Sequence, residues 1–176
     1  MDKKYISVFG SWRPRQGTSE YQAAYELSFQ LAQKGYYIIN GGGSGVMAAS
    51  TEGALAGGTG ALGVMIGDLP YDFKRHKNNP VITCATLYER LEKLISSSQG
   101  YVVFSGGTGT LVELSLLWEE MNKGLLSRRP VVCFGDHWAP LIHMFQKHPG
   151  FVKEDALNII QFADSTEEVI KKLMLD

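Results

Sequence analysis

The chain has 176 residues, of which 17 are basic and 18 acidic, giving a formal net charge of −1. This size predicts one globular domain, and the balanced charge excludes a broadly basic surface, so neither a membrane nor a nucleic acid is an expected partner. No apolar stretch reaches the roughly 18 residues of a membrane span, and Cys84 and Cys133 lack metal-binding spacing. We therefore expect a cytoplasmic protein with reduced cysteines and no bound metal.

Short apolar runs alternate with amphipathic segments along the whole chain. The runs expected to form strands cover residues 5–9, 36–39, 61–66, 101–104, 131–134 and 157–162. Several are unbroken, as in parallel strands that are covered on both faces. Between them we expect helices, the first opening at Ser19 with Gln22 at capping-box spacing and ending before Gly35, the last opening at Ser165. Residues 67–83 fit no period and indicate a surface loop, which serves either as a functional lid or as a solvated excursion.

This alternation predicts an α/β fold with a doubly wound, Rossmann-like parallel sheet. The helices would cover both faces of the sheet in a three-layer α/β/α sandwich. We expect residues 1–176 to form this single nucleotide-binding domain.

Two segments each read as an apolar strand, a glycine-rich turn and a helix, at residues 38–47 and 103–111. Glycines let a ligand approach the backbone closely, and the amino end of a helix favours a phosphate group. In a doubly wound sheet both turns would lie at the carboxyl ends of the strands, where ligands bind. Neither segment matches the Walker or the dinucleotide pattern. The alternative is that these glycines only permit tight turns.

Glu113 and Arg90 are the candidate reactive side chains. Glu113 lies on the flank of an apolar helical stripe, and no Lys or Arg stands three or four residues away to form an ion pair with it. The alternative to a reactive role is that Glu113 caps its helix, because Thr110 and Glu113 have capping-box spacing. Arg90 has no acidic residue at either helical neighbour distance, so it is free to bind a group outside its own helix. Its alternative role is to cover apolar surface with its stem.

The segment Ser105-Gly-Gly-Thr-Gly-Thr-Leu-Val-Glu113 is similar to the motif Pro-Gly-Gly-x-Gly-Thr-x-x-Glu, and Glu89-Arg90-Leu91 to a helix motif with Glu-Arg-Lys. Through these motifs the chain resembles the LOG (Lonely Guy) family of nucleoside 5′-monophosphate phosphoribohydrolases, often labelled lysine decarboxylase-like. The resemblance runs from about residue 5 to residue 134. Three positions depart from the family pattern, namely Ser105 for proline, Leu91 for lysine and Val112 for an acidic residue.

The resemblance implies a hydrolase that cleaves the N-glycosidic bond of purine nucleoside 5′-monophosphates, cytokinin nucleotides among them, and releases the base and ribose 5-phosphate. It implies a homodimer, no cofactor, and Arg90 and Glu113 as the catalytic pair. The substrate-binding residues that it implies are Gly10, Ser11, Gly42, Gly43, Ser44, Gly106, Gly107, Thr108, Gly109 and Thr110.

The alternative within the same superfamily is a non-catalytic carrier that binds a nucleotide or molybdenum cofactor. We exclude lysine decarboxylation, because that chemistry needs a buried Schiff-base lysine for pyridoxal phosphate. The only His-Lys dipeptide, His76-Lys77, lies in the polar irregular segment. The sequence does not decide which base is preferred.

Overall fold

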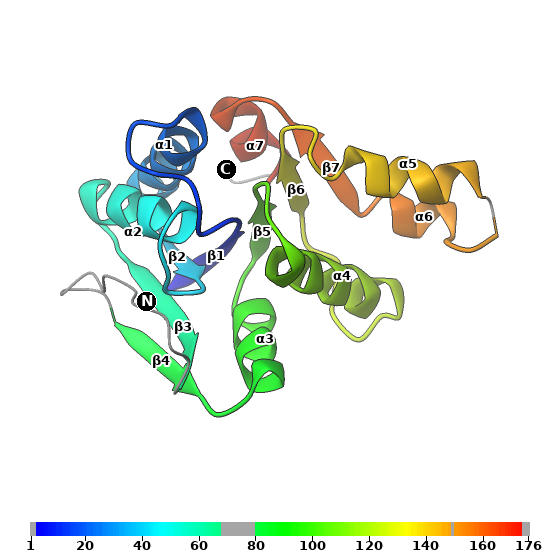
Figure 1. The fold of residues 1–176 in the computed structure, drawn as a ribbon, viewed down its shortest axis with the longest axis horizontal. Helices are drawn as coiled ribbons and strands as arrows, with labels where there is room; N and C mark the ends of the chain where they lie inside the picture. Colours follow the sequence, from blue (N-terminus) through cyan, green and yellow to red (C-terminus); the bar gives the residue numbers. More distant parts are fainter. Residues whose placement is uncertain (1–2, 68–79, 149, 174–176) are drawn as a thin grey trace.

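The computed structural model describes residues 3–67, 80–148 and 150–173. Strands and helices alternate along the chain (Figure 1). In chain order they are β1 (Lys4–Phe9), α1 (Ser19–Gln33), β2 (Tyr36–Asn40), α2 (Val46–Ala56), β3 (Ala61–Ile66), β4 (Val81–Cys84), α3 (Leu87–Ser96), β5 (Gly100–Val103), α4 (Thr108–Asn122), β6 (Val131–Phe134), α5 (Ala139–Lys147), α6 (Glu154–Leu157), β7 (Ile160–Ala163) and α7 (Thr166–Lys172).

The strands form one parallel sheet in the order β4-β3-β2-β1-β5-β6-β7. The sheet grows from β1 in one direction as far as β4 and then restarts on the other side of β1 with β5, so the doubly wound prediction is confirmed. The strand order therefore reverses between β1 and β5, where Phe9 is paired with Val103. Crevices beyond the carboxyl ends of such a pair are where open α/β sheets bind ligands.

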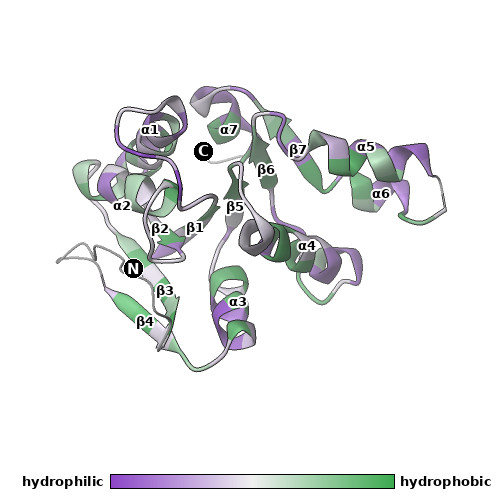
Figure 2. Cartoon of the chain, viewed as in Figure 1, coloured by the Kyte–Doolittle hydropathy of each residue, from purple (hydrophilic) through white to green (hydrophobic). Residues whose placement is uncertain are grey.

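Helices cover both faces of the sheet and enclose two hydrophobic clusters (Figure 1). Side chains of α1, α2 and α7 pack on one face, and those of α3, α4, α5 and α6 pack on the other. The two clusters share the strands, because successive side chains point to opposite faces: Val102 of β5 packs in the first cluster and Val103 in the second. Figure 2 shows the central strands coloured hydrophobic and the helices with mixed surfaces. The three-layer prediction is thus confirmed.

Two strand predictions need correction. Strand β4 begins inside the segment 67–83 that was expected to be a loop and ends one residue beyond it. It escaped prediction because Ile82 and Thr83 of this edge strand are exposed, so no buried apolar run marks it. The apolar run at 157–162 is not one strand: it spans the end of α6 and the start of β7, since buried helices and strands look alike over so few residues. Most of the predicted loop, residues 68–79 with His76-Lys77, lies outside the described residues.

One helix start also differs from its prediction. The cap of α1 is Thr18, whose side-chain oxygen accepts a hydrogen bond from the backbone N–H of Tyr21 at 3.4 Å, and Ser19 is the first helical residue. The other signals are confirmed. Gly35 follows α1 with a φ of 85°, and Ser165 caps α7 by accepting from the N–H of Glu168 at 3.2 Å.

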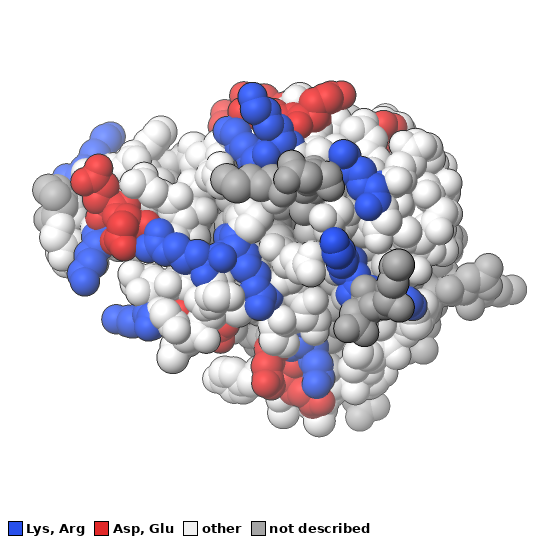
Figure 3. All heavy atoms as spheres, turned by 180° about the vertical axis from the view of Figure 1, so that it is seen from behind, with Lys and Arg blue, Asp and Glu red and all other residues white. Residues whose placement is uncertain are grey.

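Charged side chains are dispersed on the face seen in Figure 3, which views the molecule from behind. Lys and Arg side chains lie there in separate groups, with Asp and Glu beside several of them. On this face the described residues form no continuous basic stripe of the kind that tracks a nucleic acid. Within the described ranges, no helix is long and apolar enough to cross a membrane.

Candidate active site

The structure brings Arg90 and Glu113 together, although 23 positions separate them in the sequence. Leu91, Leu94 and Ile95 face the core from α3 and leave Arg90 on the flank of that helix. There Nη1 donates to Oε1 of Glu113 at 3.2 Å, and Nε donates to the carbonyl of Val64, in β3, at 2.9 Å. The prediction that Arg90 binds a group outside its own helix is confirmed.

The capping alternative for Glu113 is wrong. Helix α4 begins at Thr108 and its cap residue is Gly107, so Thr110 is already the third helical residue and Glu113 the sixth. The Glu113 side chain therefore stands beyond the first turn of α4 and turns toward α3. Its carboxylate is engaged with Arg90 instead of with the amino end of its own helix.

Glu113 is buried, with 8% of its side chain exposed, against 17% for Arg90. Burial disfavours the charged carboxylate and raises its pKa from 4.5 to about 7, although the nearby Arg90 guanidinium acts in the opposite direction. At neutral pH the acid and the carboxylate are thus both populated. A carboxyl group in this condition can both accept and return a proton, which is what general acid–base chemistry needs.

The glycine-rich turn after β2 is organised by Asn40, a buried residue that the sequence analysis did not select. The Asn40 side-chain amide donates to the Met47 carbonyl and to two hydroxyl groups of α2, each at 3.0 Å. Its oxygen accepts from the N–H of Gly42 at 2.9 Å, and Gly42 has a φ of 74° that favours glycine. The sequence does mark Asn40, because it is the polar residue that directly follows the apolar run of β2.

The turns after β1, β2 and β5 meet at one edge of the sheet. The N–H of Ser11 donates to the Ser105 carbonyl, and the Ser11 carbonyl accepts from the N–H of Val46, both at 2.9 Å. The Ser44 hydroxyl donates to the carbonyl of Trp12 at 3.0 Å. Gly10 is enclosed as well, since a Cβ atom there would lie 2.8 Å from Val46. The predicted residues of these turns therefore gather where β1 and β5 end.

The glycines of the turn before α4 differ in their surroundings. A side chain on Gly106 would overlap Thr110, so packing alone explains that glycine. A Cβ atom on Gly107 or Gly109 would meet nothing within 4 Å, and neither residue has a positive φ. Packing of the chain therefore does not require glycine at these two positions, which leaves open space beside the amino end of α4.

A pocket of about 360 Å³ lies on the other side of this turn, toward α1. Its lining residues are Ser19, Glu20, Ala23, Ser105, Phe134, Gly135, Asp136 and His137. The Ser105 hydroxyl donates to Glu20 there, and Nε2 of His137 lies 3.1 Å from the Gly106 carbonyl. These contacts, which the sequence analysis also missed, join the turn to α1 and to the loop after β6.

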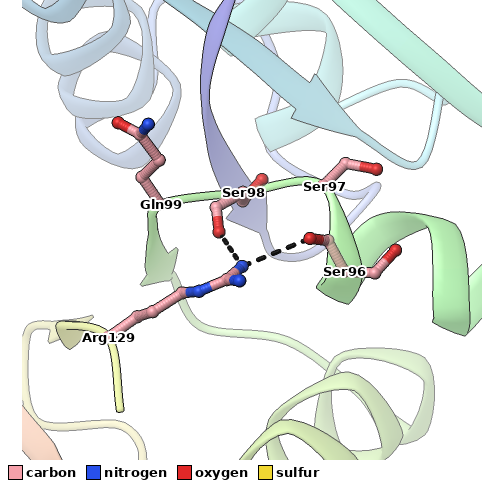
Figure 4. A pocket seen from close by; sticks show the side chains of 5 residues that line it. All are labelled: Ser96, Ser97, Ser98, Gln99 and Arg129. Carbon is pink, nitrogen blue, oxygen red and sulfur yellow. Dashed lines mark hydrogen bonds between the residues drawn. The ribbon is translucent and has the colours of Figure 1, made fainter. Parts of the chain in front are cut away.

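Another pocket, of about 270 Å³, lies at the opposite edge of the sheet, where β5 begins (Figure 4). Its lining residues are Ser96, Ser97, Ser98, Gln99 and Arg129. The Arg129 guanidinium donates to the backbone carbonyls of Ser96, the last residue of α3, and of Ser98, two residues beyond, and the carboxyl end of a helix favours a cation. Because Arg129 is occupied in this way and the pocket lies far from the glycine turns, we do not place the functional site here.

A doubly wound sheet with glycine-rich turns and a buried Glu–Arg pair at its carboxyl edge defines a Rossmann-like α/β protein, a class in which ligands bind at the switch point of the sheet. The chain belongs to the family described as "Possible lysine decarboxylase", whose model matches residues 47–173. This is the label that the LOG family carries, so the resemblance inferred from the motifs is confirmed.

Curated relatives carry a consistent name. The chain is 29% identical over 159 residues to a "Probable cytokinin riboside 5'-monophosphate phosphoribohydrolase" of Oryza sativa subsp. japonica, covering 86% of this chain and 70% of that protein. It is 28% identical to the "Cytokinin riboside 5'-monophosphate phosphoribohydrolase LOG1" of Arabidopsis thaliana, covering 97% and 82%. An "Uncharacterized protein" of Archaeoglobus fulgidus is 32% identical over 132 residues, covering 74% of this chain and 83% of that protein.

Solved structures share the fold. The molybdenum cofactor binding protein of Rippkaea orientalis superimposes with a TM-score of 0.74 at 23% identity, covering 99% of both chains. The molybdenum cofactor carrier protein of Chlamydomonas reinhardtii gives a TM-score of 0.72 at 23% identity, covering 99% of this chain and all of that one. At this identity the comparison shows the common fold.

Proposed function

We propose that the protein hydrolyses the N-glycosidic bond of purine nucleoside 5′-monophosphates, releasing the free base and ribose 5-phosphate. The observation that carries this proposal is the buried carboxylate of Glu113. Glu113 lies in α4, the helix that follows the glycine turn, and its carboxylate is held by Arg90. The names of the curated relatives support the same reaction.

The 5′-phosphate would bind at the amino end of α4. Free backbone N–H groups and the positive helix end favour a phosphate there, and the open space at Gly107 and Gly109 lets it approach the backbone. The Thr108 hydroxyl, on an exposed residue, is a further donor. The turns that contain Ser11 and Gly42 to Ser44 would border the rest of the nucleotide.

Glu113 would act at the anomeric carbon of the ribose. From Thr108 to Glu113 the helix rises by about 7.5 Å, which suits a ribose whose phosphate sits at the helix end. The carboxylate stabilises the oxocarbenium character of the sugar and takes a proton from the attacking water. The water oxygen forms the new bond to the anomeric carbon, the bond to the base nitrogen breaks, and the proton that Glu113 takes from the water is passed on to the leaving base.

Arg90 would orient the Glu113 carboxylate and bind the ribose or the phosphate. Its Nη1 contacts Glu113 and its Nε is anchored on the Val64 carbonyl, so the guanidinium plane is fixed from two sides. A planar guanidinium with several donors suits this double task.

None of the three departures from the family motif takes part in the hydrogen bonds that Arg90 and Glu113 make among the described residues. Leu91 is buried in the core, Val112 is exposed on the surface of α4, and the Ser105 hydroxyl contacts Glu20. The Arg90–Glu113 ion pair is intact in their presence. The departures are therefore compatible with turnover, and we expect them to affect which nucleotide is preferred.

We further propose that the protein acts as a homodimer on cytoplasmic nucleotides. Leu114, Leu117, Trp118 and Met121 of α4 are buried within the chain itself, so the apolar character of this helix needs no partner to explain it. The exposed Leu87 and Tyr88 of α3 and Val112 of α4 remain as apolar surface beside the reactive pair that a second copy could cover. Sedimentation of the purified protein tests this.

The first experiment incubates the purified protein with AMP and, separately, with isopentenyladenosine monophosphate. Chromatography then measures free base and ribose 5-phosphate. We expect release that is lost in Glu113→Gln and Arg90→Ala, and the ratio of the two rates gives the base preference. Equal release by wild type and by Glu113→Gln would contradict the assigned role of Glu113.

A carrier function is the second candidate, because the chain aligns over its full length with proteins named as molybdenum cofactor carriers, at 26% identity in one case. A carrier would bind a phosphate-bearing cofactor at the same glycine turn. Saturable binding of AMP without any release of base, at every pH tested, would favour this function over the hydrolase.

A further inference from the structure

The glycine turn before α4 is held by three groups from two other segments, the turn after β1 and the loop after β6. The indole N–H of Trp138 donates to the Phe104 carbonyl at 2.9 Å, and the N–H of Ser11 donates to the Ser105 carbonyl at 2.9 Å. His137 makes the next contact along the turn, with its Nε2 lying 3.1 Å from the Gly106 carbonyl. Successive carbonyls of the turn are therefore each held by a separate donor.

The His137 contact fixes which way the next peptide group faces. A carbonyl oxygen can only accept, so Nε2 of His137 must carry the proton. In a planar trans peptide the C=O and the following N–H point to opposite sides. When the Gly106 carbonyl points toward His137, the N–H of Gly107, the cap residue of α4, consequently points away from His137.

This peptide needs an outside group to hold it. It joins two glycines, whose φ and ψ angles are the least restricted of any residue, so the chain itself does little to fix its orientation. His137 is well placed for this task, because its ring packs edge-on against the buried Trp138, with ring centroids 4.7 Å apart. His137 itself is exposed and adds little to the core.

We propose that His137 is a positioning residue, which orients the Gly106–Gly107 peptide so that the Gly107 N–H is presented to the phosphate of the ligand. This rests on the proposed function for the identity of the ligand as a nucleoside monophosphate. It assigns His137 no contact with the reacting atoms. Its role is to have the phosphate donor in place before the ligand arrives, which saves the cost of ordering a glycine peptide on binding.

The test varies the His137 side chain of the protein and the phosphate group of the ligand independently. Calorimetry compares the binding of AMP and of adenosine to wild type and to His137→Ala. We expect the AMP affinity to fall about tenfold, the size of one lost hydrogen bond to a charged group, and the adenosine affinity to stay the same. In turnover assays KM for AMP should rise by a similar factor with little change in kcat, because the phosphate contact is made in both ground and transition states.

Two further variants separate positioning from a general structural effect. The side-chain amide nitrogen of glutamine can occupy the place of Nε2 and donate to the same carbonyl, so His137→Gln should restore most of the AMP affinity. His143→Ala removes another exposed histidine, on α5, and should leave AMP binding unchanged. Equal weakening of AMP and adenosine in His137→Ala, or no rescue by glutamine, would overturn the assignment.

The outcomes also separate this inference from the hydrolase. If wild type binds AMP and His137→Ala weakens that binding, but no base is released, the hydrolase is wrong and the positioning role stands. If base is released and His137→Ala binds AMP as wild type does, the hydrolase stands and the positioning role is wrong. Failure of wild type to bind AMP would overturn both.

Discussion

Gly41 lies directly against Arg90, so that a Cβ atom at position 41 would overlap Nη2 of the guanidinium. The first glycine of the turn after β2 thus leaves the space in which the Arg90 side chain reaches Glu113, in addition to the proposed role of this turn at the ligand. The same Cβ atom would also lie 2.8 Å from the sulfur of Met47. Both neighbours are the ends of flexible side chains, and both can move.

This arrangement predicts that Gly41→Ala damages activity more than stability. The added methyl group should push the guanidinium away from Glu113, lowering kcat at least tenfold, while the melting temperature falls only slightly because no backbone atom must move. Base release and thermal unfolding measure the two effects. Gly60→Ala is the matched control, because a Cβ atom there meets only Leu55, at 3.8 Å. A large loss of stability in Gly41→Ala would contradict the explanation.

The pKa of Glu113 predicts the pH dependence of the reaction. If the carboxylate accepts the proton of water, kcat/KM should rise with pH through an apparent pKa of about 7 and level off above it. Arg90 holds the pKa of Glu113 below the value that burial alone would give, so in Arg90→Met the pKa of Glu113 should rise. A profile of kcat/KM against pH for wild type tests the first expectation. Carboxyl-carbon NMR titration of Glu113 in both proteins tests the second without needing turnover, and an equal pKa in the two proteins would contradict it.

The same pKa predicts a pH dependence of stability. The folded-state pKa of Glu113 lies above the unfolded value near 4.5, so the folded protein retains the proton over this interval. The stabilising contribution of Glu113 is therefore complete below about pH 4.5 and is lost as the pH rises through 7. Compared with Glu113→Gln, which cannot titrate, wild type should lose up to about 3 kcal/mol of unfolding free energy between pH 5 and 8.

Urea unfolding of both proteins at these two pH values measures the difference. Comparing the change with pH, instead of the stability at one pH, removes the separate effect that the substitution has on the ion pair with Arg90. A difference between the two proteins that stays constant over this range would show that Glu113 titrates normally.

The open surroundings of Gly109 predict a separation of stability from binding. Alanine there meets no neighbour and favours the helix, so Gly109→Ala should unfold at the same or a slightly higher temperature, with a gain of up to about 1 kcal/mol. A methyl group beside the helix end should nevertheless hinder a phosphate, and we expect AMP affinity to fall several-fold while adenosine affinity is unchanged. Unaltered AMP binding would place the phosphate elsewhere.

The sequence by itself determined the architecture and the candidate residues. Unbroken apolar runs predict buried parallel strands, and glycine turns followed by helices predict a ligand site at their carboxyl ends, because these signals are local and repeat at short range. The absence of helical partners for Arg90 and for Glu113 indicated that each was free to bind elsewhere. The other strands were found because their side chains are apolar and buried. Strand β4 was missed because its central residues are exposed and leave no apolar pattern.

Only the tertiary structure decided which of these groups meet. The ion pair of Arg90 with Glu113, the space that Gly41 leaves for it, and the hold of His137 on the Gly106 carbonyl all join segments that the order of strands brings together. Local patterns cannot encode such contacts, because each partner is compatible with several neighbours until the sheet places it. The same holds for the pKa of Glu113, which depends on burial by α3 and α4 and not on any residue beside it in the sequence.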